Sequence, residues 1–265
     1  MDLGLKNKVA VLTGGGAIGG IGWATVKELV AEGVQVVMGD IRVESGYSEL
    51  SRYGYVVTQE IDLSLAGNPD KLVETALGAF GRLDFLINNL GISPIRTGFL
   101  DTKDEDWDRT HSINFMSNVR ATRAALPHLI KNKGAIVNLA STLGSAPIPT
   151  MVDYCAFKSA TLNLTKSLSE EFGPKGVRVV AISPGPVLTP QWSRPGGQLE
   201  NMAKAMNTDS KTMRTKLLPD ILKLVVGRMV ESEEIAAAIV FALSGRMGAM
   251  TGSQIVVDAG CLKTI

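Results

Sequence analysis

Three side chains in the middle of the chain have the types and the spacing of an acid–base site. Tyr154 and Lys158 are four residues apart, so on a helix they would project from the same face, with about 5–6 Å between their Cβ atoms. Ser141 follows residues 134–139, whose apolar pattern predicts a buried strand, and open α/β sheets bind ligands beyond the carboxyl ends of their strands. A nearby cation lowers the pKa of a phenol from its ordinary value of about 10. The trio therefore predicts a tyrosine that exchanges a proton with a substrate oxygen, while the serine hydroxyl binds that oxygen.

A glycine-rich turn near the amino terminus supports this interpretation, which the spacing of Tyr154 and Lys158 alone would leave open to chance. Residues 8–12 predict a short apolar strand, residues 13–22 contain six glycines, and residues 23–32 have a helical pattern. Glycines allow positive φ and let the backbone approach a pyrophosphate, whose charge the free amides and dipole of the helix stabilise. A glycine-rich surface turn without a ligand is the alternative, but strand, turn and helix in this order favour dinucleotide binding.

Asp40 bears on which dinucleotide binds. It follows the second apolar strand, predicted over residues 34–38, and lies eighteen residues beyond Gly22, the last glycine of the turn. A carboxylate at this point accepts hydrogen bonds from the hydroxyls of the adenosine ribose and repels a 2′-phosphate. Arg42 is the opposing signal, because a guanidinium two residues away could hold such a phosphate. We expect NAD as the cofactor, with NADP as the less favoured alternative.

With these motifs the sequence resembles the classical short-chain dehydrogenase/reductase family, from about residue 5 to residue 260. The matching motifs are the turn at 13–22, Asp62 with Leu63, the sequence Asn-Asn-Leu-Gly at 88–91, Asn114, the set of Ser141, Tyr154 and Lys158, and residues 184–189. The resemblance implies an α/β fold with a single Rossmann-type, doubly wound domain over residues 1–265. Its parallel sheet of about seven strands should be flanked by helices on both faces.

The resemblance also implies functions for individual residues. The catalytic residues would be Asn114, Ser141, Tyr154 and Lys158, with no metal ion. The cofactor-binding residues would be Gly14, Gly16, Gly20, Ile21, Gly22, Asp40, Ile41, Asp62, Leu63, Asn89, Gly91, Tyr154, Lys158, Pro184, Gly185, Val187 and Thr189. Among these, Lys158 would bind the nicotinamide ribose and Thr189 the carboxamide, while an inward Asn114 would hold a water linked to Lys158. The alternative for Asn114 is a polar residue on an exposed helical face.

The sequence departs from the family pattern in three places. Five residues separate Gly14 from Gly20 where the family has three, so the resemblance does not fix the individual phosphate contacts. Leu90 replaces an alanine and should crowd the wall near the adenosine unless the neighbouring backbone shifts. Ala259 replaces the first glycine of a terminal Asp-Gly-Gly, a change that should not affect function.

Apolar strands and helical segments alternate along the rest of the chain, which is typical of a parallel sheet covered by helices. Further strands are predicted over residues 55–61, 83–87, 177–182 and 255–257, and a helix over 233–243.

Several residues predict where helices begin and end. Asn68, as a capping residue, should begin a helix that ends at Gly81. Thr102 with Glu105 should form a capping box at the start of the next long helix, which Pro127 should end or kink.

Residues 190–226 have a different character, because they are rich in Met, Leu and Lys. Apolar residues recur with helical spacing over 199–206 and again over 217–226. In the family this stretch covers the substrate, so we expect a helical lid over about 190–226 whose thioethers adapt to a bulky apolar molecule. The alternative is that these side chains only pack the segment onto the core or onto a neighbouring subunit.

Composition limits the class of protein. The 27 basic and 26 acidic side chains leave a formal charge of +1, so we expect neither nucleic acid nor membrane as a partner. No signal peptide or apolar run of about 18 residues is evident, which predicts a cytoplasmic location. Cys155 and Cys261 form no CxxC pair, and His111 and His128 are too few for a zinc site or a histidine-based triad.

These observations predict an NAD-dependent oxidoreductase that interconverts a secondary alcohol and a ketone, with a small hydrophobic or cyclic molecule as substrate. One alternative is an NADP-dependent 3-oxoacyl-thioester reductase, whose acyl carrier protein would meet Lys204, Lys211, Arg214 and Lys216. Another is a nucleotide-binding scaffold without turnover, because a fold alone does not establish activity. The resemblance further implies a homo-oligomer, either a tetramer or a dimer.

Overall fold

Seven apolar segments pair into one parallel sheet in the computed structural model of the chain, which describes residues 1–51 and 54–263. The strands are β1 (Val9–Thr13), β2 (Gln35–Asp40), β3 (Val56–Glu60), β4 (Phe85–Asn88), β5 (Ala135–Leu139), β6 (Arg178–Pro184) and β9 (Gln254–Val257). Their order is β3-β2-β1-β4-β5-β6-β9, and each neighbouring pair is parallel. The order reverses between β1 and β4, which is where doubly wound sheets bind ligands. The predicted α/β fold is confirmed.

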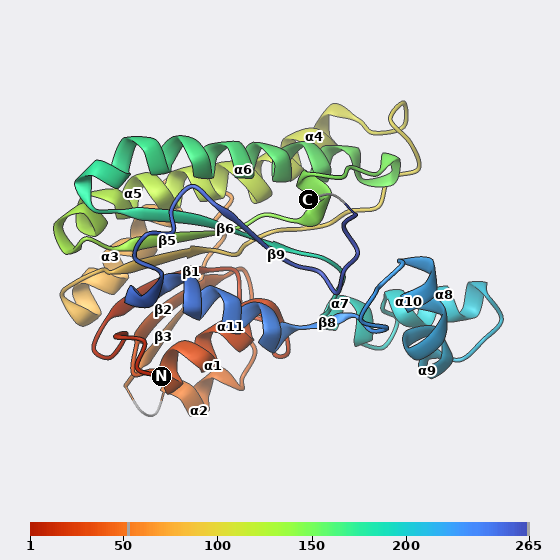
Figure 1. Cartoon of the computed structure of the whole chain (residues 1–265), viewed down its shortest axis with the longest axis horizontal. Coiled ribbons are helices and arrows are strands. Elements are labelled where there is room, and N and C mark those ends of the chain that lie inside the picture. Colours follow the sequence, from red (N-terminus) through yellow and green to blue (C-terminus); the bar gives the residue numbers. More distant parts are fainter. Residues whose placement is uncertain (52–53, 264–265) are drawn as a thin grey trace.

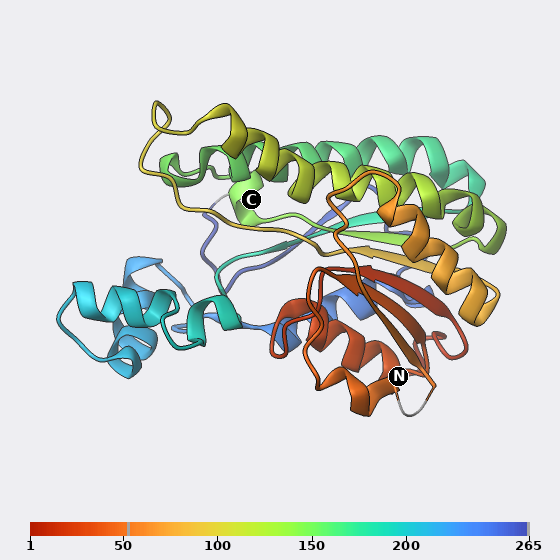
Figure 2. The same ribbon diagram turned by 180° about the vertical axis from the view of Figure 1, so that it is seen from behind.

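Helices cover both faces of the sheet (Figures 1 and 2). On one face α1 (Ile21–Ala31) packs beside α11 (Ser232–Leu243), and on the other lie α3 (Asn68–Phe80), α5 (Ser117–Asn132) and α6 (Val152–Phe172). The shorter helices α2 (Tyr47–Ser51) and α4 (Asp104–His111) precede β3 and α5. Single 3-10 turns occur at Thr142–Gly144, Pro149–Met151, Gly173–Lys175 and Gly245–Met247, and a π-helical turn at Ser112–Met116.

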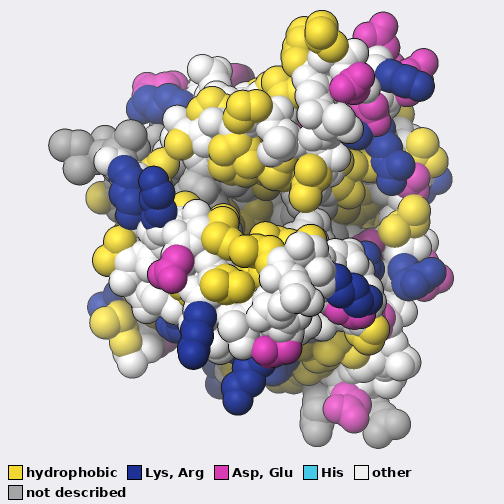
Figure 3. All heavy atoms as spheres, turned by 90° about the vertical axis from the view of Figure 1, so that its right-hand side faces the viewer, with side chains coloured by type: hydrophobic (Ala, Val, Ile, Leu, Met, Phe, Trp, Pro, Cys, Tyr) yellow, Lys and Arg dark blue, Asp and Glu magenta, His cyan; other side chains and the backbone are white. Residues whose placement is uncertain are grey.

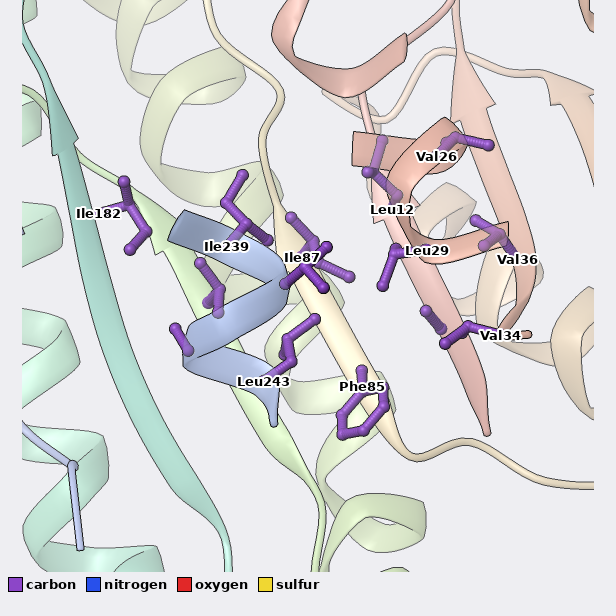
Figure 4. Packing of buried hydrophobic residues seen from close by; sticks show 14 of the residues in the cluster. Leu12, Val26, Leu29, Val34, Val36, Phe85, Ile87, Ile182, Ile239 and Leu243 are labelled. Atoms are coloured by element: carbon purple, nitrogen blue, oxygen red, sulfur yellow. The ribbon is translucent and has the colours of Figure 1, made fainter. Parts of the chain in front are cut away.

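Alternate residues of β1 enter two different hydrophobic clusters, one on each face of the sheet. Ala10 and Leu12 pack with side chains of α1 and with Ile239 of α11 (Figure 4). Val9 and Val11 pack with side chains of α3 and α5. All five are fully buried, and burying a Val, Leu or Ile side chain contributes about 1.5–3 kcal/mol. The central strands are therefore rigid supports for the loops that follow them.

The predicted start and end of α3 are confirmed, but the predicted capping residue is not. Gly81 ends the helix with a φ of 74°, a value that glycine adopts without strain. At the other end Gly67 is the capping residue, and Asn68 is already helical. The Asn68 amide instead donates from Nδ2 to the carbonyl of Asp62 at 2.8 Å.

Two predicted helix boundaries in the middle of the chain are not confirmed. Thr102 and Glu105 do not form a capping box, because Lys103 is the capping residue and its N–H donates to Asp106 Oδ2 at 3.2 Å. Pro127 does not end α5, which continues to Asn132, and a kink at the proline stays a prediction. Buried neighbours on both sides of the proline hold this helix against the sheet, so packing outweighs the missing N–H.

Residues 190–226 form a helical extension beyond the carboxyl edge of the sheet (Figure 1). Its helices are α7 (Pro190–Ser193), α8 (Gln198–Ala205), α9 (Ser210–Thr212) and α10 (Leu218–Ile221), with a π-helical turn at Met213–Leu217. They pack around a small cluster of their own that includes Leu199, Met213 and Leu218. At its base β7 (Val187–Leu188) pairs with β8 (Val230–Glu231), a ladder that the sequence did not predict. The helical pattern over 217–226 outlasts the helix, which ends at Ile221.

Candidate active site

The residues singled out in the sequence come together at the carboxyl edge of the sheet. The glycine turn follows β1, Asp40 ends β2, residues 89–91 follow β4, Ser141 follows β5, and residues 185–189 follow β6. Tyr154 and Lys158 lie in the first two turns of α6. The predicted acid–base trio and the predicted dinucleotide site therefore share one edge, because the carboxyl ends of parallel strands meet there.

Ser141 and Lys158 are each fixed by a bond to the backbone. Ser141 caps the short turn that follows it, and its Oγ accepts a hydrogen bond from Leu143 N at 3.1 Å. Lys158 is 3% exposed, and its Nζ donates to the carbonyl of Leu139 at 2.6 Å. The same Nζ lies 5.6 Å from the ring centroid of Tyr154. The helix thus brings the ammonium to the phenol, as the four-residue spacing predicts.

Burial governs the pKa of both titratable groups. It raises the pKa of Tyr154 to about 12, a shift that the hydrogen bond with Ser141 only partly reverses. Burial also lowers the pKa of Lys158 to about 8. Each shift favours the uncharged form, as loss of hydration does. The prediction that Lys158 lowers the pKa of the phenol toward neutrality is wrong for this structure, because burial is the largest cause of the shift and the ammonium donates its hydrogen bond to Leu139.

Asn114 lies inward, in the π-helical turn between α4 and α5, and is fully buried. Its Oδ1 accepts a hydrogen bond from Ile92 N at 2.7 Å, and its Nδ2 donates to Ile92 O at 2.8 Å. The amide is therefore bonded to the loop after β4, and the water that the resemblance implied stays a prediction. A Cβ on Gly91 would lie 3.0 Å from Asn114 Oδ1 and 3.6 Å from Lys158 Nζ. Glycine at this position permits the loop to approach both side chains.

The backbone of the glycine turn, called here the glycine cradle, packs so closely on its neighbours that side chains at Gly14 and Gly22 would clash. A Cβ on Gly14 would lie 2.6 Å from the Cα of Leu90, and one on Gly22 would lie 2.5 Å from the Cα of Gly15. The crowding expected from Leu90 is thus accommodated by a glycine with a φ of 71°. Helix α1 begins at Ile21 without a side-chain cap, so its first amides suit a phosphate. The cradle fits the pyrophosphate of a dinucleotide.

Asp40 is bonded to the glycine turn itself. Its Oδ2 accepts hydrogen bonds from the amides of Gly15 and Gly16, each at 2.8 Å. The side chain is half-buried, whereas Arg42 is exposed. The carboxylate therefore stands where the sequence predicts the ribose and also fixes the turn, a second role that the sequence did not reveal.

The lengthened turn folds back onto residues 44–47, which hold it from the other side. Glu44 Oε2 accepts a hydrogen bond from Ile18 N at 3.0 Å, and the Tyr47 hydroxyl donates to Gly15 O at 2.6 Å. Burial, and then the carboxylates of Asp40 and Glu44, raise the pKa of Tyr47, which keeps its hydroxyl a donor. Sequence reasoning missed both residues, although an acid and a phenol soon after Asp40 were a signal.

Several other predicted cofactor residues are fixed by contacts of their own. Asn89 donates from Nδ2 to the carbonyls of Thr13 and Gly14, so it holds the turn. A Cβ on Gly185 would lie 2.6 Å from the Cβ of Asp258, so the loop after β6 packs on the terminal segment. Thr189 caps α7 and Gly20 caps α1.

The remaining predicted cofactor residues differ in exposure. Asp62 Oδ1 accepts bonds from the amide and hydroxyl of Ser64, while Leu63 is 1% exposed. Ile41 is 72% exposed, whereas Pro184 and Val187 are buried. A buried Leu63 side chain leaves only its backbone for a ligand.

One cluster beside the site was not predicted at all. Asp153, next to Tyr154, is fully buried and pairs with Arg96 at 2.6 Å. Thr110 and Asp106 bond to the same pair. An acidic residue in the first turn of the helix was the only local signal, because its partners are distant in sequence.

The fold and the site define the class of protein. Residues 16–261 match the family model described as Enoyl-(Acyl carrier protein) reductase. The chain belongs to the short-chain dehydrogenase/reductase family, whose members bind a nicotinamide dinucleotide, and it is an oxidoreductase of the short-chain alcohol dehydrogenase type.

Several known proteins are similar over nearly the whole chain. The 2-(S)-hydroxypropyl-CoM dehydrogenase 3 of Xanthobacter autotrophicus is 33% identical over 270 residues, which cover 97% of each chain. The meso-2,3-butanediol dehydrogenase of Serratia marcescens is 33% identical over 96% of this chain and 94% of its own. The crystal structure of L-sorbose reductase from Gluconobacter frateurii, complexed with NADPH and L-sorbose, has a TM-score of 0.91 at 30% identity and covers 100% of both chains.

Within residues 1–51 and 54–263, no helix combines the length and the apolar character needed to cross a membrane. In the same part of the chain, no group of three or more His, Cys, Asp and Glu side chains is placed to hold a metal ion.

Proposed function

We propose that the protein interconverts a secondary alcohol and a ketone, with NAD as the preferred cofactor. In the oxidative direction the alcohol and NAD⁺ give the ketone, NADH and one proton. The observation that carries the proposal is the meeting of Ser141, Tyr154 and Lys158 beside the glycine cradle. This arrangement supplies a hydroxyl for the substrate oxygen, a phenol for proton exchange and an ammonium next to that phenol.

Each member of the trio has a separate part in the reaction. Ser141 donates a hydrogen bond to the substrate oxygen and holds this oxygen beside Tyr154. The reacting groups are then already oriented, which raises the rate of the chemical step. Tyr154 gives a proton to that oxygen in reduction and, as the phenolate, takes it back in oxidation, a contribution of about 10²–10⁴-fold. When bound, the nicotinamide exchanges a hydride with the carbinol carbon. Lys158 faces Tyr154 and would bind the ribose next to that ring.

The proposed preference for NAD rests on two carboxylates that bind the glycine turn. Asp40 and Glu44 accept hydrogen bonds from the amides of the turn, and two carboxylates there oppose a 2′-phosphate. Exposed Arg42, and the NADPH in the related L-sorbose reductase structure, favour NADP instead. The two carboxylates are fixed by hydrogen bonds, whereas Arg42 is not among the side chains that bind the turn, and this difference supports NAD.

An apolar substrate is supported by the surface at the lid end of the molecule. Apolar side chains gather above and below a hollow on this face (Figure 3). On the loop after β4, Ile95, Phe99 and Leu100 are at least 65% exposed, and on the segment after α10, Val225 and Val226 are at least 60% exposed. Such exposed apolar groups mark a surface that binds something. We propose that the 190–226 segment is the substrate lid.

A reductase of 3-oxoacyl thioesters with NADPH remains the second candidate. The matching family model is described as an acyl carrier protein reductase, and Lys204, Lys211, Arg214 and Lys216 lie on the proposed lid, where an acidic carrier could dock. A scaffold without turnover has no specific support from the site. The homo-oligomer and the cytoplasmic location stay predictions.

A substrate panel with both cofactors tests the proposal. The wild type should reduce NAD⁺ with meso-2,3-butanediol, cyclohexanol or 1-phenylethanol faster than it oxidises NADPH with an acetoacetyl thioester. Tyr154→Phe should lose about 10²–10⁴-fold in kcat/KM with the active alcohol. Exposed Tyr55 provides the control, since Tyr55→Phe should keep wild-type rates. Wild-type turnover by Tyr154→Phe would refute the role of the phenol.

A further inference from the structure

Arg96 and Asp153 form a buried ion pair one residue from Tyr154. Asp153 is 0% exposed, and its Oδ2 accepts hydrogen bonds from Arg96 Nη2 at 2.6 Å, Arg96 Nε at 3.1 Å and Thr110 Oγ1 at 2.7 Å. The other oxygen, Oδ1, accepts from Tyr154 N at 2.9 Å. One carboxylate thus bonds both to the backbone of the tyrosine and to an arginine 57 residues away in the chain.

The pair joins three segments that surround the proposed site. Arg96 lies on the loop between β4 and α4, and its Nη1 donates to Asp106 of α4 at 2.7 Å. The backbone N–H of Arg96 donates to Thr150 O at 2.7 Å, just before α6 begins. Ile92, near the start of the same loop, bonds to Asn114. The loop with the exposed apolar residues is therefore tied to the start of the helix that carries Tyr154.

The carboxylate of Asp153 and the guanidinium of Arg96 pair with each other rather than with a ligand. Burial by itself raises the pKa of Asp153. The hydrogen bonds from Arg96, Thr110 and Tyr154 N lower this pKa by more than burial raises it, so the net shift is downward and the group stays a carboxylate. An anion in the first turn also stabilises a helix through its dipole and its free amides. Four of the five donors that a guanidinium offers are used within the cluster.

We propose that Asp153 and Arg96 are positioning residues, which hold the first turn of α6 so that the phenol of Tyr154 meets a substrate oxygen bound by Ser141. The inference rests on the function proposed above for Tyr154. A purely structural ion pair is the alternative. It would contribute to the stability of the fold, and the chemical step would not depend on it.

The test compares Asp153→Asn, Arg96→Gln and the double variant in the full-length protein, with NAD⁺ and the fastest alcohol of the panel. Each single variant should lower kcat by about 10–100-fold, because small displacements of a reacting group cost this much. KM and the Kd for NAD⁺ should change by no more than about threefold. The double variant should be no slower than the slower single one, since both changes remove the same contact. The isotope effect on kcat with carbinol-deuterated alcohol should rise.

Conservative and remote variants separate positioning from stability. Arg96→Lys keeps the charge and should recover part of the kcat lost in Arg96→Gln. Because the Arg96 side chain is 15% exposed, the Arg96 variants can still be measured if Asp153→Asn does not fold. The control is Arg82 with Asp84, a pair in which Asp84 is 2% exposed and also accepts a bond from Val9 N, near the amino ends of the strands. Arg82→Gln and Asp84→Asn should lower the melting temperature and leave kcat within about twofold.

Three results would overturn the inference. The first is a wild-type kcat in folded Asp153→Asn and Arg96→Gln. The second is a loss of kcat in the double variant that equals the product of the two single losses. The third is an equal loss of kcat in the Arg82 and Asp84 variants. Tyr154→Phe is measured beside them. If it is inactive while the pair variants are normal, the positioning role alone fails. If it is active, or if the wild type oxidises no alcohol of the panel, the proposed function fails and the inference with it.

Discussion

Replacing Asp40 by alanine tests whether one carboxylate both orders the glycine turn and selects the cofactor. The change removes the two hydrogen bonds that Oδ2 accepts from Gly15 and Gly16, each at 2.8 Å. It also removes the negative charge at the predicted ribose position. The first loss should weaken binding of both cofactors, while the second should favour NADP⁺.

The two effects have different sizes. A hydrogen bond to a charged group contributes about 1.5–3 kcal/mol. Because Asp40 is only half-buried, the lower value applies, and the two bonds together are worth about 3 kcal/mol, or about 100-fold in Kd. A doubly charged phosphate at about 4 Å from a carboxylate costs about 2 kcal/mol even at the dielectric of water. Asp40→Ala should therefore raise the Kd for NAD⁺ by up to about 100-fold and shift the ratio of the two Kd values toward NADP⁺ by about 30-fold.

Calorimetric titration of wild type and variant with NAD⁺ and NADP⁺ measures both quantities. Asp209→Ala is a suitable control, because Asp209 also accepts two hydrogen bonds, from Thr212 N at 2.9 Å and Thr212 Oγ1 at 2.7 Å, but lies in the helical extension. It should leave both Kd values unchanged. If Asp40→Ala keeps both wild-type Kd values, the turn does not depend on the carboxylate; if only the ratio is unchanged, Asp40 does not select the cofactor.

Two further changes probe the interior of the site. Gly91→Ala would bring a Cβ to 3.0 Å from Asn114 Oδ1, which should cost about 1 kcal/mol of stability and about tenfold in kcat. The control is Gly78→Ala, at an exposed helical position with open space around it, which should instead stabilise the fold by about 0.5–1 kcal/mol. If the two variants change the stability in urea unfolding equally, the close approach at Gly91 is refuted. Lys158→Met tests whether burial lowers the pKa of Lys158 from 10.5 to about 8. Between these two pH values the folded wild type binds fewer protons than the unfolded chain, so its unfolding free energy rises with pH. The unfolding free energy of the wild type minus that of the variant should increase from pH 8 to pH 10 by about 2 kcal/mol, and a flat difference would contradict the shift.

The sequence predicts the sheet and the reacting groups well because both depend on local patterns. Each buried strand is a short apolar run bounded by turn residues, and the strand, turn and helix around Gly14 form one continuous unit. Tyr154 and Lys158 are related by helical spacing, so their proximity follows once the helix exists. Ser141 follows from its place after β5. None of these relations requires knowledge of distant contacts.

Contacts between distant segments were beyond the sequence. Asp153 and Arg96 are 57 residues apart, and Asn114 and Ile92 are 22 apart, so neither pair leaves a spacing signal. The pKa of Tyr154 was misjudged for the same reason: a neighbouring cation is visible in the sequence, whereas loss of hydration depends on every segment packed around the phenol. The continuation of α5 past Pro127 likewise depends on tertiary packing.

The shifted pKa values change what Lys158 does for Tyr154. With the pKa of Lys158 at about 8 and that of Tyr154 at about 12, rising pH removes the proton from the ammonium before the phenol ionises. No pH therefore makes ammonium and phenolate the main forms together through these two groups alone. Near neutrality Lys158 acts by position, because its Nζ bonds to Leu139 at the end of β5, and so ties the strand that leads to Ser141 to the helix that carries Tyr154. The partial lowering of the tyrosine pKa comes from Ser141, the hydroxyl that this tie holds in place.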